Sequence, residues 1–346
     1  MSQAPLVIVP YRSFGTDDVL VVRGRVLRDR LPSAAEPDQS PWRNLRDAWR
    51  HIESDEVRGA PLTVSCGAHM VETVTDDEGY FEVHLPPVGS ARDADGWCTV
   101  TVAAPGAAVD APLAQATGAV LIPPATARFG VISDIDDTIL QTQATNLVRS
   151  AWVTLLQNAA TRAPFPGVAA LYRALQGGVT GADHNPIFYV SSSPWNLYNF
   201  LVEFMQVRGI PAGPIFLRDY GIGMITQALS HDHKLASMHR VLDAYPHLPF
   251  VLMGDSGQKD PELYTRLVEQ YPGRVLAIYI RDVSGAKRDA AVDAMAAALQ
   301  AQGVLLRRVA DSLVAAQSAA ALGLITAPAL DAVCAAMADE EAPHAA

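Results

Sequence analysis

The sequence contains little cysteine and no long hydrophobic run. Its three cysteines, Cys66, Cys98 and Cys334, are odd in number and far apart, so they match neither a disulfide framework nor the spacing of a metal site. No stretch approaches the roughly 18 to 20 apolar residues of a membrane span. The N-terminus shows no basic segment followed by an apolar core. These absences predict a cytoplasmic protein, either free or bound peripherally at a membrane.

Positive charge is also scarce. The chain has 26 Lys and Arg against 37 Asp and Glu, a net charge of −11, and no basic cluster stands out. This balance argues against nucleic acid as a partner and provides no attraction to an anionic membrane. Only Lys234, Lys259 and Lys287 are lysines. A lysine inside a polar motif therefore carries more weight than usual.

The length of 346 residues predicts about two domains. Residues 1–127 are expected to form a small all-β, sandwich-like domain and a linker, because short segments with period-two alternation are separated by turn residues. The Ala-, Pro- and Gly-rich segment 103–127 is interpreted as that linker. The alanine-rich segment 311–346 is expected to be a helical tail, with residues 339–346 disordered.

The segment 128–310 alternates between apolar, strand-like runs and helical segments. This order is typical of an α/β fold with a largely parallel sheet and crossover helices. Strands are expected at residues 129–134, 187–191, 215–217, 250–253, 275–280 and 304–308, and helices near 168–175, 197–207, 233–244 and 261–271.

Carboxylates follow two of the expected strands. The first strand ends in Asp134-Ile135-Asp136-Asp137-Thr138, and a later one ends at Asp255 with Asp260 close behind. Ligands bind at the carboxyl edge of open α/β sheets, although an acidic turn or a helix N-cap has the same composition. If the two strands are neighbours, Asp134, Asp136 and Asp255 converge. Carboxylates that converge repel each other and need a hard cation such as Mg²⁺.

Two further groups of polar residues lie in the segment 128–310. Ser191-Ser192-Ser193 ends a strand before a helix, a pattern that fits either a phosphate site or an ordinary N-cap. Lys234 opens a helix, where it either neutralises the carboxylates or lies on the surface. His231 and His233 flank it, but no third ligand follows at zinc spacing.

In this order, Asp134–Thr138, Ser191, Lys234 and the Asp255/Asp260 pair resemble the four motifs of the haloacid-dehalogenase (HAD) phosphotransferase superfamily. More narrowly, residues 189–197, 217–221, 254–262 and 278–282 are similar to the actin-patch-protein type of phosphatidate phosphatase, a lipin-like catalytic domain. The resemblance covers about residues 128–310. It implies a HAD-like Rossmannoid sheet with a minimal cap, and Mg²⁺-dependent hydrolysis of phosphatidic acid to diacylglycerol and phosphate.

The resemblance also implies a role for individual residues. Asp134 would attack phosphorus and form an aspartyl-phosphate, and Asp136 would protonate the departing alkoxide and then deprotonate water. Lys234 would offset the charge of the nucleophile and the phosphate. The phosphate would be bound by Ser191, Ser192, Lys234 and Arg218. Mg²⁺ would be held by the carboxylates of Asp134 and Asp255 and the backbone carbonyl of Asp136, with Asp260 bound directly or through water.

Several alternatives stay open. The substrate is either phosphatidic acid or another phosphomonoester, such as a phosphoprotein or a nucleic-acid end, and the intact motifs argue against an inactive scaffold. Apolar residues within 141–162 fit a helix packed on the sheet or one that touches a bilayer. No role is assigned to Trp195, Asn196, Asp219 or Arg281. Arg218 could instead form a structural ion pair with Asp219, and Arg281 one with Asp282.

Overall fold

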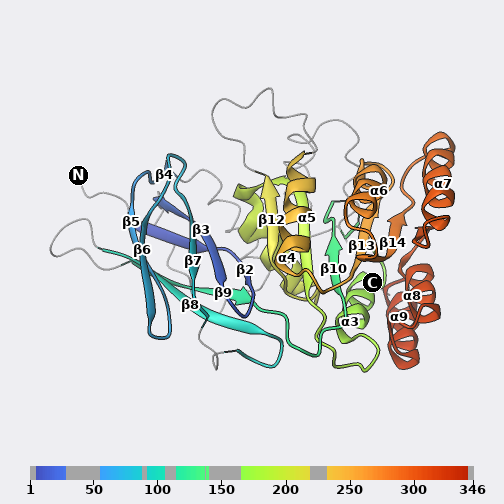
Figure 1. The fold of residues 1–346 in the computed structure, drawn as a ribbon, viewed down its shortest axis with the longest axis horizontal. Helices are drawn as coiled ribbons and strands as arrows, with labels where there is room; N and C mark the ends of the chain where they lie inside the picture. Colours follow the sequence, from blue (N-terminus) through green and yellow to red (C-terminus); the bar gives the residue numbers. More distant parts are fainter. Residues whose placement is uncertain are drawn as a thin grey trace, which may run out of the picture.

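The computed structural model describes residues 5–28, 55–87, 92–105, 114–136, 138–139, 165–218 and 232–341. These residues form two parts that lie side by side (Figure 1). The first part is a mainly antiparallel β sheet, and the second is a parallel sheet with helices on both faces. The mixture of a β part and an α/β part confirms the coarse fold class predicted from the sequence.

The β part contains nine strands in its described residues. They pair in the order β1-β3-β2-β9-β8-β5-β6, with β4 and β7 also paired to β3, and every pair except β2–β9 is antiparallel. Side chains alternate between buried and exposed along β5 and β7, as period-two segments predict. The strands are β1 (Leu6–Pro10), β2 (Ser13–Gly15), β3 (Leu20–Arg28), β4 (Asp55–Glu56), β5 (Pro61–Cys66), β6 (His69–Val74), β7 (Tyr80–Leu85), β8 (Trp97–Ala104) and β9 (Ala114–Leu121).

Strand β9 corrects the prediction of a linker over 103–127. It pairs with β8 along its whole length, from Trp97 opposite Leu121 to Ala104 opposite Ala114. Its first residues are mainly alanine, glutamine and glycine, which have a low intrinsic β propensity, so the pairing partner determines the strand. Gly118 fits a close approach, because a Cβ atom there would lie 2.8 Å from the side chain of Pro10.

The second part is built on a six-stranded, all-parallel sheet. Its order is β12-β11-β10-β13-β14-β15, which makes β11 and β13 the neighbours of β10. This confirms the predicted parallel sheet and the pairing of the two strands that end in carboxylates. The strands are β10 (Gly130–Ser133), β11 (Ile187–Pro194), β12 (Ile215–Arg218), β13 (Phe250–Asp255), β14 (Val275–Arg281) and β15 (Leu305–Val309).

Helices cover both faces of this sheet. Helices α5 (Asp232–Ala244), α6 (Asp260–Gln270) and α7 (Ala286–Gln300) bury apolar residues against one face. Helices α3 (Val168–Gly177), α4 (Tyr198–Val207), α8 (Ser312–Ala321) and α9 (Ala327–Glu341) cover the other (Figure 1). A short 3₁₀ helix, η2 (Trp195–Leu197), precedes α4. Within the described residues, no helix combines the length and hydropathy needed to cross a membrane.

The alanine-rich tail is helical, as predicted, and belongs to the core. Ala316 of α8 and Val333 of α9 are buried in the same cluster as Leu171 of α3. Helix α9 continues to Glu341, so the predicted disorder from residue 339 is wrong as far as Glu341, and 342–346 lie outside the described residues. A contact near its end explains this: the carboxylate of Glu340 accepts a hydrogen bond from the backbone N–H of Gly167 at 3.0 Å.

The two parts share a buried interface. Tyr11 and Phe14 of the β part lie in the apolar clusters that cover the two faces of the parallel sheet. The hydroxyl of Tyr245 in the α/β part donates to the backbone carbonyl of Gly15 at 2.9 Å. The β part is therefore packed onto the α/β part rather than attached only through the chain.

Candidate active site

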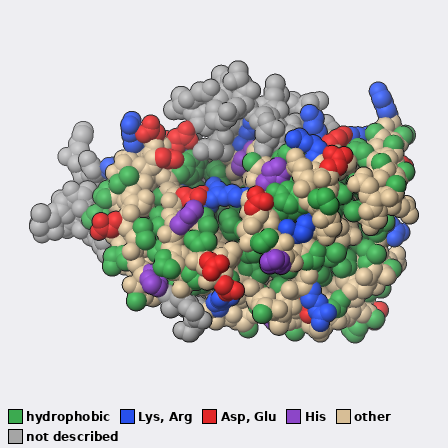
Figure 2. Space-filling view, in the orientation of Figure 1, with side chains coloured by type: hydrophobic (Ala, Val, Ile, Leu, Met, Phe, Trp, Pro, Cys, Tyr) green, Lys and Arg blue, Asp and Glu red, His purple; other side chains and the backbone are tan. Residues whose placement is uncertain are grey.

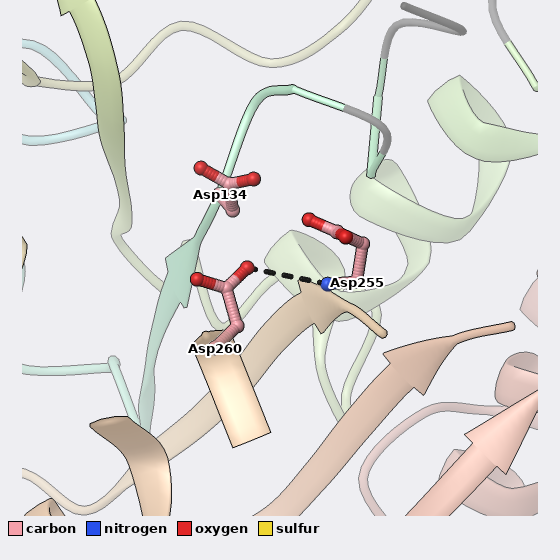
Figure 3. Close-up of side chains that lie close together, drawn as sticks. All are labelled: Asp134, Asp255 and Asp260. Atoms are coloured by element: carbon pink, nitrogen blue, oxygen red, sulfur yellow. Dashed lines mark hydrogen bonds between the residues drawn. The ribbon is translucent and has the colours of Figure 1, made fainter. Parts of the chain in front are cut away.

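Three buried aspartates converge at the carboxyl edge of the parallel sheet (Figure 3). Asp134 follows β10, Asp255 ends β13 and Asp260 opens α6, and each offers a carboxylate oxygen within 4.8 Å of the others. Neighbouring parallel strands end at the same edge, and the backbone N–H of Asp134 donates to the carbonyl of Met253 at 2.8 Å. Of the three residues predicted to converge, Asp134 and Asp255 meet in this cluster, whereas Asp136 is not part of it and Asp260 takes the third place.

The loop between β13 and α6 brings Asp260 back onto this edge. Its Oδ2 atom accepts a hydrogen bond from the backbone N–H of Asp255 at 3.2 Å (Figure 3). Gly254 permits this return, because a Cβ atom there would lie 2.6 Å from that same oxygen. Asp260 therefore lies in the cluster itself, and its binding of Mg²⁺, directly or through water, stays a prediction.

Lys234 supplies a buried cation to the cluster. Its Nζ atom lies 2.8 Å from Oδ1 of Asp134 and 2.8 Å from Oδ1 of Asp260. Burial acts to lower the pKa of Lys234, but the charges of Asp134 and Asp260 outweigh burial and raise that pKa. The side chain therefore stays protonated. The alternative of a surface lysine is excluded, because the side chain is only 5% exposed.

The charges of the cluster do not balance. Burial raises the pKa of Asp134 well above its ordinary value, Lys234 acts to lower it, and the nearby charges of Asp260, Asp136 and Asp255 raise it further. Three carboxylates against one ammonium leave an excess of negative charge. Carboxylate oxygens are the ligands that hard divalent cations prefer, so this donor set fits such an ion. His231, the other half of the possible zinc pair, lies outside the described residues.

Gln258 links the cluster together, and no role was assigned to it from the sequence. Its side chain donates to Oδ2 of Asp134 at 3.4 Å and accepts from Lys234 at 3.3 Å. Its backbone N–H donates to Oδ1 of Asp255 at 2.8 Å. The signal was present, since Gln258 stands between Asp255 and Asp260 in a single loop, but a glutamine in a glycine-containing loop is not distinctive.

Asp136 forms a second group with two serines of β11. Ser191 and Ser193 both donate through their hydroxyls to Oδ2 of Asp136, at 2.8 and 3.2 Å. The hydroxyl of Ser191 also accepts from the backbone N–H of Ser193 at 2.9 Å. The alternative of a helix N-cap is wrong, because Pro194 and Leu197 occupy the N-cap positions of η2 and α4, and the serines hold the carboxyl of Asp136 instead. The role of Ser193 was missed, while phosphate binding by Ser191 stays a prediction.

The structure places several of the other residues that the sequence suggested for the site. Arg218 ends β12, the edge strand two positions from β10, and is opposite Pro194 in the pairing. Phosphate binding by Arg218 and by the half-buried Ser192 stays a prediction. Thr138 is buried. Asp137, Asp219 and the segment 141–162 lie outside the described residues.

Trp195 and Asn196 face the β part. The ring of Trp195 stacks on Tyr11, with centroids 4.1 Å apart and an interplanar angle of 14°. Oδ1 of Asn196 accepts a hydrogen bond from Nη1 of Arg25 at 3.0 Å. These residues follow the serine run after Pro194, so the β part contacts the chain next to the serines that hold Asp136.

Arg281 and Asp282 do not form the pair that the sequence suggested. Arg281 donates to the hydroxyl of Ser312 at 3.2 Å, and its guanidinium carbon lies 3.9 Å from the ring centroid of Phe165. Asp282 accepts from Arg308 of the neighbouring strand β15 instead. Burial lowers the pKa of Arg281 to about 10.

Sequence comparison identifies relatives of this half of the chain. Residues 129–282 match the family model described as the catalytic domain of phosphatidate phosphatase APP1. Phosphatidate phosphatase APP1 of Saccharomyces cerevisiae is 35% identical over 163 residues, which are 46% of this chain and 27% of that protein. An uncharacterized protein of Schizosaccharomyces pombe is 28% identical over 158 residues, 45% of this chain and 25% of that protein. The aligned segment spans about a quarter of these relatives.

Comparison with solved structures adds little. A carbohydrate acetylesterase from Xanthomonas citri aligns with 78% of this chain and 68% of its own, at 13% identity. The TM-score of 0.29 is too low to indicate a common fold. The family match covers the strands from β10 to β14 with all the aspartates of the site, and it leaves out the β part.

Proposed function

Because residues 129–282 belong to the catalytic-domain family of phosphatidate phosphatase APP1, we propose that this chain hydrolyses phosphatidic acid to diacylglycerol and phosphate. The observation that carries the proposal is the cluster of Asp134, Asp255 and Asp260 around Lys234, which lies inside the matched segment. The position of Asp134 at the end of a central strand supports a HAD-like sheet. Since phosphatidic acid is a bilayer lipid, we infer that the protein works at a membrane surface.

The cluster also supports a Mg²⁺ ion as cofactor. The carboxylates of Asp134 and Asp255 and the backbone carbonyl of Asp136 would hold it, and Asp260 would stand beside them or bind through water. The excess negative charge of the buried cluster fits a divalent cation. When bound, Mg²⁺ supplies charge neutralisation and orientation of the phosphate.

In the proposed reaction an oxygen of Asp134 attacks phosphorus, and the bond between phosphorus and the glycerol oxygen breaks. The ammonium of Lys234 and the amide of Gln258 fix this carboxylate, which carries the phosphoryl group as an aspartyl-phosphate. Lys234 also reduces the repulsion between the carboxylate and an anionic phosphate. Water then attacks the aspartyl-phosphate, which restores Asp134 and releases inorganic phosphate.

Asp136 is proposed to move the protons. It gives one to the departing glycerol oxygen and takes one from the attacking water. Ser191 and Ser193 both bond its Oδ2 atom, so we assign the transferred proton to Oδ1. Serine hydroxyls that fix the carboxyl keep the proton donor in one orientation through both steps.

Phosphate release from phosphatidate in detergent micelles tests this function. We expect the protein to hydrolyse phosphatidate in preference to soluble phosphomonoesters, and chelation of Mg²⁺ to remove the activity. A phosphopeptide and a 5′-phosphorylated oligonucleotide serve as the competing substrates. Equal or faster hydrolysis of either would contradict the lipid assignment and favour the broader phosphatase. No hydrolysis of any ester would favour a binding protein.

A further inference from the structure

A cleft of about 590 Å³ lies between the two parts of the molecule. Strands β3, β6 and β7 line one side, and β12 and α5 line the other. Basic and acidic side chains lie next to one another on the surface between the β part and the α/β part (Figure 2). The walls include Arg23, Tyr80, Glu82, Trp195, Phe216 and Arg240.

Two chain segments connect the lining of the cleft to the candidate active site. Trp195 lines the cleft and follows closely after Ser193, whose hydroxyl bonds Asp136. His233 also lines it and directly precedes Lys234, whose ammonium bonds Asp134. Two residues of the lining are therefore close along the chain to the groups assigned to the nucleophile and to the departing oxygen.

The polar groups of the cleft nearly cancel in charge. Glu82 pairs with both Arg23, at 3.3 Å, and Arg240, at 2.5 Å. Asp76 is a second carboxylate of the lining, and its Oδ1 accepts two backbone N–H groups of its own turn. Two guanidinium groups and two carboxylates make a poor site for a phosphate. They do provide hydrogen-bond donors for an uncharged carbonyl.

Aromatic side chains also line the cleft. The guanidinium of Arg23 lies 5.1 Å from the ring centroid of Trp195 and 5.9 Å from that of Phe216, and Tyr80 faces the same space. A wall that combines aromatic rings with fixed hydrogen-bond donors suits a ligand that combines hydrocarbon with ester groups. The phosphate of such a ligand is left to the aspartate and lysine cluster.

We propose that this cleft binds the ester-bearing glycerol and the first part of the acyl chains of phosphatidate, and so selects the lipid substrate. The inference rests on the proposed function, and it gives the β part a direct role in recognition. Arginine N–H groups then donate to ester carbonyls, while the aromatic rings contact the acyl chains.

Filling the cleft tests this inference. Ala236 is an exposed residue of α5 that lines the cleft, and Ala294 is an exposed residue of α7 that serves as the matched control. We expect Ala236→Trp to lower kcat/KM for phosphatidate at least about tenfold more than for glycerol 3-phosphate, since several methylenes lose their contacts. Ala294→Trp is expected to change neither value. An equal change for both esters in Ala236→Trp, or none, would overturn the inference.

Binding of dioctanoylglycerol, measured by titration calorimetry, separates this inference from the proposed function. We expect the unmodified protein and Ala294→Trp to bind it and Ala236→Trp to bind it at least about tenfold more weakly. If phosphatidate is not hydrolysed but this pattern of binding is observed, the proposed function is wrong and the proposed lipid-binding role of the cleft is supported. If phosphatidate is hydrolysed and Ala236→Trp binds dioctanoylglycerol as well as the unmodified protein, the cleft proposal fails alone.

Discussion

At the scale of single residues, Lys234 decides whether three carboxylates can be buried together. Its ammonium contacts Asp134 and Asp260, both almost fully buried. A buried charge that loses its partner is costly, because the remaining ions keep neither water nor a counter-ion. The lysine therefore serves the fold as well as the proposed reaction.

Replacement of Lys234 by methionine isolates this effect, because methionine keeps much of the apolar stem. We expect Lys234→Met to lower the free energy of unfolding by about 3 to 5 kcal/mol, as measured by urea unfolding without divalent cations. Lys287→Met, at an exposed position of α7, is the control and is expected to change it by less than about 0.5 kcal/mol. Equal free energies of unfolding for the two variants would show that Lys234 does not compensate the negative charge of the buried carboxylates.

The residues that could be predicted from sequence are those at the ends of apolar strands. Asp134 and Asp255 each follow a run of buried residues, so their place at the sheet edge follows from parallel pairing. Gln258 and Ser193 could not be assigned, because their roles depend on which side chain reaches them across the sheet. The hydrogen bonds to Asp134 and Asp136 are tertiary contacts, which local patterns do not encode.

At the scale of elements, the loop from β13 to α6 holds the site together. It carries Asp255, Gln258 and Asp260, and it returns so closely that Gly254 has no room for a side chain. A methyl group there would displace the carboxylate of Asp260 from the backbone N–H of Asp255. The position of Asp260 also fixes one of the two carboxylates that Lys234 contacts.

We expect Gly254→Ala to lower phosphate release from phosphatidate on the order of tenfold or more, with a loss of about 1 to 3 kcal/mol in the free energy of unfolding. Gly285→Ala is the matched control, because a Cβ atom at Gly285 meets nothing within 4 Å. Kinetics and urea unfolding of both variants make the test. Unchanged kinetics in Gly254→Ala would mean that the position of Asp260 is irrelevant to activity.

The elements of the α/β part were more predictable than those of the β part. Strand β10 overlaps the apolar run from Phe129 to Ile132, and β14 is apolar from Val275 to Ile280, so their sequences identify them. Strand β9 has little β propensity of its own and exists because β8 pairs with it. Helix α9 extends through Asp339–Glu341 because Glu340 is bonded to Gly167, a contact far away in sequence.

At the scale of the whole molecule, the β part is joined to the α/β part by buried aromatic contacts. Tyr11 stacks on Trp195 and also contacts the ring of Tyr198, with centroids 4.5 Å apart. The family match begins at residue 129 and does not include Tyr11. From sequence alone neither Trp195 nor Asn196 could be assigned, because their partners belong to a different part of the chain.

We expect Tyr11→Ala to lower the free energy of unfolding by about 3 kcal/mol, since a large buried ring is lost from the shared interface. Because both parts share that interface, unfolding is expected to remain a single transition. Far-UV circular dichroism and tryptophan fluorescence, followed together in urea, check both statements. Two separate transitions, with only one of them shifted, would show that the parts fold independently.

The central claim is that Asp134 is the nucleophile of a Mg²⁺-dependent phosphatidate phosphatase, and the turnover of Asp134→Asn measures it most directly. Asparagine keeps the size of the side chain but not its charge, and Lys234 still pairs with Asp260. With saturating Mg²⁺ and a circular dichroism spectrum that matches the unmodified protein, we expect phosphate release from phosphatidate to fall on the order of a thousandfold or more. A folded Asp134→Asn protein that hydrolyses phosphatidate at the normal rate would contradict the claim.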